Sequence, residues 1–272
     1  MSANKNIALM VYGQFRSYKR NLRRNIEMLR PIWKTHNVHV FILTDKLESG
    51  NFSEENEQEI RSIMKDYSFQ VHFIRHIEDY DNTEENETAN HFFHSIHHER
   101  GTSQFAPRLI YREYFLNQLK NEYLQQNGLS MDLTVYCRIF DIKISNNLSF
   151  NAIEEQINSL YTNPNTLFGS SDTFFIGSQA AIDYLFHLAV LFKQGKPYHD
   201  TMYEDDNCVS FISSMDICLY TVRATYSPEL QYISHMFYSN YHYKNMRVDF
   251  NNPDSPLNKN ALFHVLLDPD RK

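Results

Sequence analysis

Largely apolar runs separated by helical patterns constrain the fold of this 272-residue chain more than any other feature. The segments 6–12 (NIALMVY) and 38–43 (VHVFIL) lack the alternation of a half-exposed strand, which is typical of strands buried on both faces of a parallel sheet. Between them Leu22 and Ile26 repeat at helical spacing, and a second helical pattern precedes a third apolar run at 69–74. The order β-α-β-α-β predicts an α/β fold whose parallel sheet has helices on both faces.

The rest of the chain continues this pattern around one irregular stretch. A long helix is predicted over 107–126 and a fourth core strand over 133–140. The stretch 78–103 is rich in polar and acidic residues and poor in aliphatic ones, as expected of a surface insertion. We therefore expect one α/β domain over 1–226 with a mostly parallel central sheet, and a C-terminal extension over 227–272 that packs on it.

Composition disfavours several classes of protein. Lysine and arginine number 26 and aspartate and glutamate 33, a formal net charge of −7, which disfavours a nucleic-acid binder. Only seven glycines occur, and no glycine-rich phosphate loop or nucleophile elbow, which disfavours dinucleotide oxidoreductases, P-loop NTPases and α/β-hydrolases. Three cysteines without a Cys-x-x-Cys pair indicate neither a disulfide framework nor a zinc knuckle. Since no signal-like or membrane-spanning apolar segment is evident, we expect a cytoplasmic protein.

Polar residues follow the first two predicted strands where each strand ends. Gly13, Gln14 and Arg16 come after the first strand, and Thr44 and Asp45 close the second. The carboxyl ends of parallel strands meet at one edge of a sheet, where ligands of α/β proteins bind. We expect an anion there, because cations crowd the start of the following helix. The alternatives are a plain turn at residues 44–45 and a solvated helix face for the cations.

Six segments carry a resemblance to a known family. In chain order they are IALMVYGQFRS, VHVFILTD, PRLIYREYFLNQL, VYCRIFDIKIS, SSDTFFIGSQAAIDYLF and YEDDN. Together, over residues 6–220, they resemble bacterial and viral nucleotide-diphospho-sugar glycosyltransferases, which have the GT-A fold. The resemblance implies transfer of a sugar from a nucleotide-diphosphate donor, by family habit a UDP-sugar, to a hydroxyl of a glycan or glycoconjugate. For a viral source it implies action in the host cytoplasm.

The resemblance also implies a divalent cation, Mn²⁺ or Mg²⁺, held by an Asp-x-Asp motif after the fourth strand. This chain offers only Asp141 there, with Ile139 at the position of the first aspartate. Either Asp141 holds the cation with help from a C-terminal ligand such as His235, or the site contains no metal. In a metal-free site the diphosphate would be neutralised by three arginines: Arg16, Arg108 and Arg138.

The resemblance also implies acidic residues that bind or deprotonate the acceptor. Glu204 and Asp205 stand at the start of a predicted helix, and Asp205 is the first candidate for the base that deprotonates the acceptor hydroxyl, with Glu204 the second. Charge complementarity at a helix N-terminus is the alternative explanation of this cluster. Asp172 precedes a predicted strand at 173–177 and would bind sugar hydroxyls, or is an ordinary loop residue.

Two other functions fit parts of the pattern. A non-catalytic module that binds a sugar or nucleotide would explain the missing first aspartate. A sugar nucleotidyltransferase is disfavoured, because that class opens with a glycine-rich turn and the segment GQFRS has one glycine.

Overall fold

The computed structural model describes the chain in segments. These are residues 5–13, 15–45, 53–77, 105–140, 142–146, 150–164, 166–170, 174–186, 231–233, 237–239 and 263–267. The predicted insertion at 78–103 and the predicted helix that begins at Glu204 lie outside the described residues.

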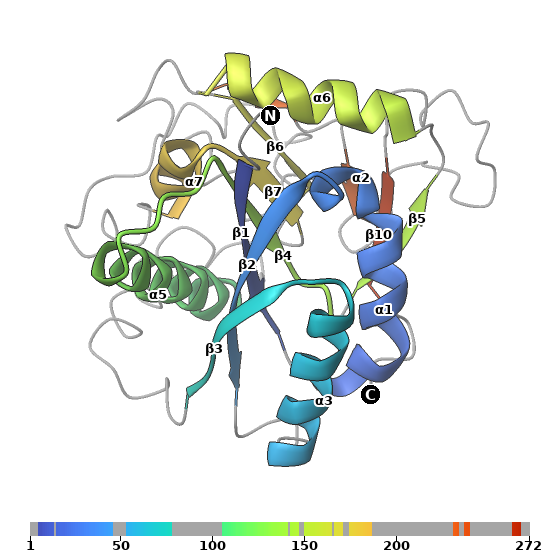
Figure 1. The fold of residues 1–272 in the computed structure, drawn as a ribbon, viewed down its shortest axis with the longest axis vertical. Coiled ribbons are helices and arrows are strands. Elements are labelled where there is room, and N and C mark those ends of the chain that lie inside the picture. Colours follow the sequence, from blue (N-terminus) through green and yellow to red (C-terminus); the bar gives the residue numbers. More distant parts are fainter. Residues whose placement is uncertain are drawn as a thin grey trace, which may run out of the picture.

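A seven-stranded sheet forms the centre of the molecule, in the order β3-β2-β1-β4-β7-β6-β8 (Figure 1). The first four strands in this order are parallel, whereas β7 runs antiparallel to both β4 and β6. The α/β class and the mostly parallel sheet are thus confirmed. The strands are β1 (Lys5–Tyr12), β2 (His36–Asp45), β3 (Gln70–Ile77), β4 (Leu133–Cys137), β6 (Thr166–Ser170), β7 (Phe174–Gly177) and β8 (Gln231–Ile233).

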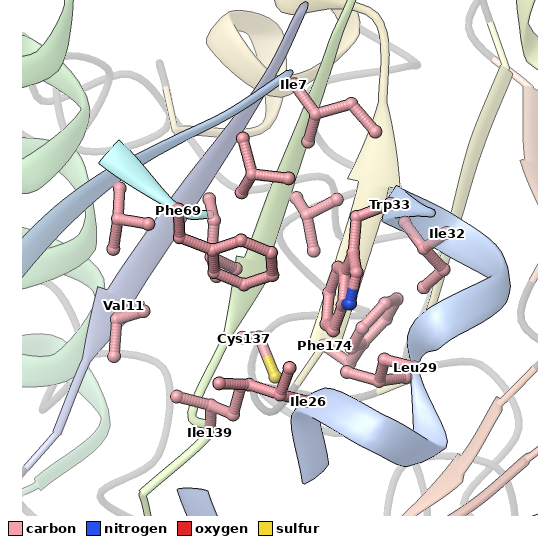
Figure 2. Packing of buried hydrophobic residues seen from close by; sticks show 14 of the residues in the cluster. Ile7, Val11, Ile26, Leu29, Ile32, Trp33, Phe69, Cys137, Ile139 and Phe174 are labelled. Atoms are coloured by element: carbon pink, nitrogen blue, oxygen red, sulfur yellow. The ribbon is translucent and has the colours of Figure 1, made fainter. Parts of the chain in front are cut away.

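Helices cover both faces of this sheet (Figure 1). One face packs against α1 (Tyr18–Met28), α2 (Arg30–Trp33), α3 (Glu54–Asp66) and α6 (Phe150–Thr162) around a continuous apolar core. Figure 2 shows part of this core, in which Ile7 and Val11 of β1 lie with Ile26 of α1 and Trp33 of α2. The other face packs against α5 (Phe105–Gln126) and α7 (Gln179–Phe186). Two helical layers therefore hold the strand ends at fixed places.

The predicted strand over 133–140 is wrong in its length. Strand β4 ends at Cys137, and the Ile142 N–H donates to the Arg138 carbonyl at 3.2 Å to close a turn. The chain then enters β5 (Ile142–Asn146), which belongs to a second sheet of order β5-β10-β9 with β9 (Phe237–Ser239) and β10 (Phe263–Leu267). The apolar run misled the prediction because Ile139 and Phe140 are buried in the core from the turn itself.

The segment 227–272 contributes strands to both sheets. Strand β8 pairs with β6 in the central sheet, and β10 pairs with β5 in the second sheet. The boundary between a domain over 1–226 and an extension stays a prediction. None of the helices in the described part of the chain combines the length and the apolar composition that are needed to cross a bilayer.

Candidate functional site

The ends of β1 and β2 meet at one edge of the sheet. Tyr12 closes β1 in register with Leu43 of β2, and the Gly13 N–H donates to the Leu43 carbonyl at 3.3 Å. Gly13 has a φ of 152°, which a glycine adopts more easily than any other residue, and the chain leaves the sheet there. Thr44 is buried beside this exit. The structure thus brings Gly13 and Thr44 to one place, as the sequence predicts.

Strand β4 carries polar side chains on the face that α5 and α7 cover. Thr134 donates to Gln179 of α7 at 2.9 Å, and the Tyr136 ring lies 5.8 Å from that of Phe186 in α7. Arg138 follows directly after the last residue of β4 and opens the turn that comes next. Since Met10 of β1 pairs with Tyr136, the ends of β1 and β4 carry Tyr12 and Arg138 to the same edge.

A second arginine reaches this edge from α5. Arg112 donates from Nη1 to the Tyr12 hydroxyl at 2.7 Å, and its guanidinium carbon lies 5.8 Å from the centre of the Tyr12 ring. Arg112 and Arg138 are both half-buried. We call Tyr12, Arg112 and Arg138 the strand-end cluster. It places the Arg112 guanidinium beside the end of β1 and the backbone of Arg138 directly after the adjacent parallel strand β4.

The sequence analysis missed Arg112. It predicted Arg108, which lies four residues earlier on α5. Residues four apart lie on the same face of a helix, and this spacing was the signal that could have found Arg112. The side chain of Arg108 lies outside the described residues, although its backbone belongs to α5.

The other predicted site residues fall in two groups. The backbone of Arg16 lies in the short 3-10 helix η1 (Phe15–Ser17), and that of Asp45 ends β2, but neither side chain is described. The remaining predicted residues lie outside the described residues, and their roles stay predictions: Gln14, Asp141, Asp172, Glu204, Asp205 and His235.

Two of the four exposed cations of α1 pair with acidic side chains of α3. Lys19 forms an ion pair with Glu59 of α3 at 3.5 Å, and Arg23 pairs with Asp66 of α3 at 2.8 Å. The hydrogen bond from Arg23 to Asp66 raises the pKa of that guanidinium further. These two side chains thus favour the alternative of a solvated helix face rather than an anion site.

A buried polar network lies deeper between α5, β4 and α7. Lys120 is fully buried and donates to Gln179 Oε1 at 2.9 Å, the same oxygen that accepts from Thr134. Gln179 Nε2 in turn donates to Asp183 at 2.9 Å. Burial lowers the pKa of Lys120 to about 7. Thr134 and Gly177 pair near the far ends of their strands, so this network fixes α5 and α7 rather than meeting a ligand at the strand-end cluster.

Metal-ligating side chains do not gather in the described residues. No three His, Cys, Asp or Glu side chains there stand close enough to hold an ion. The strand-end cluster offers guanidinium groups, which bind anions and not cations. The predicted cation ligands Asp141 and His235 lie outside the described residues, so the cation site stays a prediction.

Comparisons with known proteins give little guidance. No family model matches the sequence, and no curated protein matches it significantly. Among solved structures, the chain is similar to a structure titled "crystal structure of a glycosyltransferase involved in the glycosylation of the major capsid of PBCV-1". The two are 10% identical with a TM-score of 0.38 over 96% of this chain and 92% of that chain. A TM-score this low assigns neither fold nor activity to the chain.

Proposed function

We propose that the chain is a glycosyltransferase that moves a sugar from a nucleotide-diphosphate donor, a UDP-sugar, to a hydroxyl of a glycan or glycoconjugate. The observation that carries the proposal is the strand-end cluster, in which Arg112 and Arg138 stand at the carboxyl ends of β1 and β4. Guanidinium forks bind phosphate oxygens bidentately, and this edge is where α/β sheets bind nucleotides.

The reaction needs stabilisation of the negative charge that develops on the departing nucleotide diphosphate. The bond between the anomeric carbon and the β-phosphate oxygen breaks, and its electron pair stays on the departing diphosphate. Arg112 and Arg138 would stabilise that growing charge, together with Arg16 and Arg108. The hydrogen bond to the Tyr12 hydroxyl holds the Arg112 guanidinium at the carboxyl end of β1.

The acceptor side needs a base if the reaction inverts the anomeric centre. The acceptor oxygen forms the new bond to the anomeric carbon, and its proton passes to a carboxylate. Asp205 is the proposed base and Glu204 the second candidate, while Asp172 would bind hydroxyls of the acceptor.

In one form of the proposal, Asp141 holds a divalent cation. When bound, Mn²⁺ or Mg²⁺ would supply further neutralisation of the diphosphate, with His235 as a second protein ligand. Where the cation does not bind, the arginines alone would carry that charge. Activity with and without Mn²⁺ separates these two forms of the proposal.

A non-catalytic module that binds a sugar or nucleotide is the second candidate. Asp141 stands alone where the family that the sequence resembles has two aspartates, which favours loss of the cation centre. Such a module would bind UDP-sugars through the strand-end cluster without turning them over.

The deciding experiment measures UDP-sugar hydrolysis and transfer with and without Mn²⁺. Removing one charge-assisted contact costs about 1.5–3 kcal/mol, so we expect kcat/KM to fall at least about tenfold in Arg138→Gln and in Arg112→Gln. Arg24→Gln, on the exposed face of α1, is the matched control and should leave kcat/KM unchanged. UDP-sugar binding without turnover would favour the module, and the absence of both binding and turnover would refute both candidates.

A further inference from the structure

The turn that joins β4 to β5 spans residues 138–142 and contains two predicted donor-binding residues, Arg138 and Asp141. The side chains of Ile139, Phe140 and Ile142 in this turn are fully buried. Ile139 belongs to the apolar core (Figure 2), and the Phe140 ring packs edge-on against that of Phe15 at 5.3 Å. The apolar side of the turn is therefore anchored in the core.

The backbone of the turn is held by one side chain of α1. Asn25 is fully buried, and its Nδ2 donates to the carbonyls of Ile139 at 2.8 Å and Ile142 at 2.7 Å. Its Oδ1 accepts from the Ile144 N–H at 3.1 Å. These three bonds use both N–H groups and the oxygen of the amide. Asn25 thus ties the turn at Ile139 to the start of β5 at Ile142 and Ile144.

Asn21 lies one helical turn before Asn25 and adds a weaker bond. Its Nδ2 donates to the Phe140 carbonyl at 3.3 Å. The chain needs such partners here, because β4 has ended and the carbonyls of the turn have left the ladder of the central sheet. An apolar side chain at position 25 would leave two buried carbonyls and one N–H unsatisfied, which is costly.

We propose that Asn25, assisted by Asn21, is a positioning residue that fixes the turn opened by Arg138 for donor binding. This inference rests on the proposed function, since it assigns the turn to the donor site. Arg138 opens the turn, and its carbonyl is tied to the Ile142 N–H, so movement of the turn displaces its guanidinium group. A displacement of about 1 Å in such a group can lower activity by up to about a hundredfold.

The test combines hydrogen exchange with UDP binding, because exchange reports the turn whatever the chain binds. In Asn25→Leu we expect faster amide exchange in residues 138–146, unchanged exchange in β1 and β2, and a Kd for UDP raised about tenfold. The matched control is Ile63→Ala, which opens the same core from α3. It should lower the thermal midpoint but leave both the exchange of the turn and the Kd unchanged.

Three results are decisive. Unchanged exchange of the turn in Asn25→Leu overturns the positioning role, and so does faster exchange with an unchanged Kd. If the wild-type protein binds no UDP, the proposed function fails, while exchange still decides whether Asn25 holds the turn. Should Asn25→Leu not fold, Asn25→Asp replaces it, since this variant keeps the shape and the oxygen that accepts from Ile144 but loses the amide donors.

Discussion

Lys120 is a residue whose charge depends strongly on folding. Its side chain is fully buried, and burial lowers its pKa from 10.5 to about 7, although nearby Asp183 opposes the shift. Above pH 7 the folded protein therefore holds Lys120 neutral, while the unfolded chain still binds the proton. Stability must rise with pH above 7 and be lowest below it, where the folded protein has to carry a buried ammonium group.

Replacement of Lys120 by methionine should remove this dependence. We expect the free energy of unfolding of the wild type to rise by about 2 kcal/mol between pH 7 and about pH 9, from the titration of this one group. Lys120→Met has a similar volume and no charge, so its curve should be flatter by that amount. Urea unfolding at both pH values measures the difference, and parallel curves for the two proteins would contradict the assignment.

Individual site residues were predictable only where chain order determines their place. Gly13 and Thr44 follow directly from the ends of two apolar runs, and the structure brings them together. Arg112 lies at helical spacing from the predicted Arg108, but its contact with Tyr12 depends on how α5 lies across β1, which the spacing alone does not determine. Asn25 reads in the sequence as an ordinary polar residue of an amphipathic helix, whereas it is fully buried against a turn more than a hundred residues away.

At the scale of elements, the buried strands and the amphipathic helices were predicted well. The runs at 6–12 and 38–43 form β1 and β2, and the predicted helix over 107–126 is α5 with two further residues at its start. Strand β5 was missed, because the apolar residues of the preceding turn made β4 look longer. The antiparallel course of β7 was also unpredictable, since strand direction follows from long-range pairing.

The contact of α5 with β2 and β3 contains a pair of histidines that should respond to acid. His39 Nδ1 and His72 Nε2 lie 2.7 Å apart, and Tyr123 of α5 packs on His72 with ring centres 4.7 Å apart. Burial lowers the pKa of both histidines, and for His72 the neighbouring His39 adds to this shift. Burial thus favours the neutral form of both rings in the folded protein, and the free energy of unfolding falls as the pH drops below the ordinary pKa of 6.5.

We expect His39→Leu to lose less stability in acid than the wild type. The variant removes one titrating ring and keeps an apolar group at a buried position. Below pH 6.5 the protection factors of the amides of residues 119–126, which correct for the intrinsic exchange rate at each pH, should fall in the wild type and fall less in His39→Leu. His36→Gln is the control, because His36 bonds to Tyr161 and not to α5. An equal fall of these protection factors in the wild type and in His39→Leu would rule out the pair as the cause.

At the scale of the whole molecule, the two sheets depend on strands that come late in the chain. Strand β8 pairs with β6 in the central sheet, and β10 lies between β5 and β9 in the second sheet. Removal of 227–272 would leave β5 and β6 each without a partner that the full chain supplies. Open strand edges are templates for pairing with another molecule.

A chain that stops at residue 226 should therefore have a lower thermal midpoint than the full chain and should associate in solution. The matched control stops at residue 267, directly after β10, and keeps all three late strands. Thermal unfolding and size-exclusion chromatography compare the three proteins at equal concentration. We expect the 267-residue chain to behave like the full one, because its strand pairs are intact. If the 226-residue chain keeps the same midpoint and elutes as the full chain does, then 1–226 folds on its own, and the late strands add little to the stability of the two sheets.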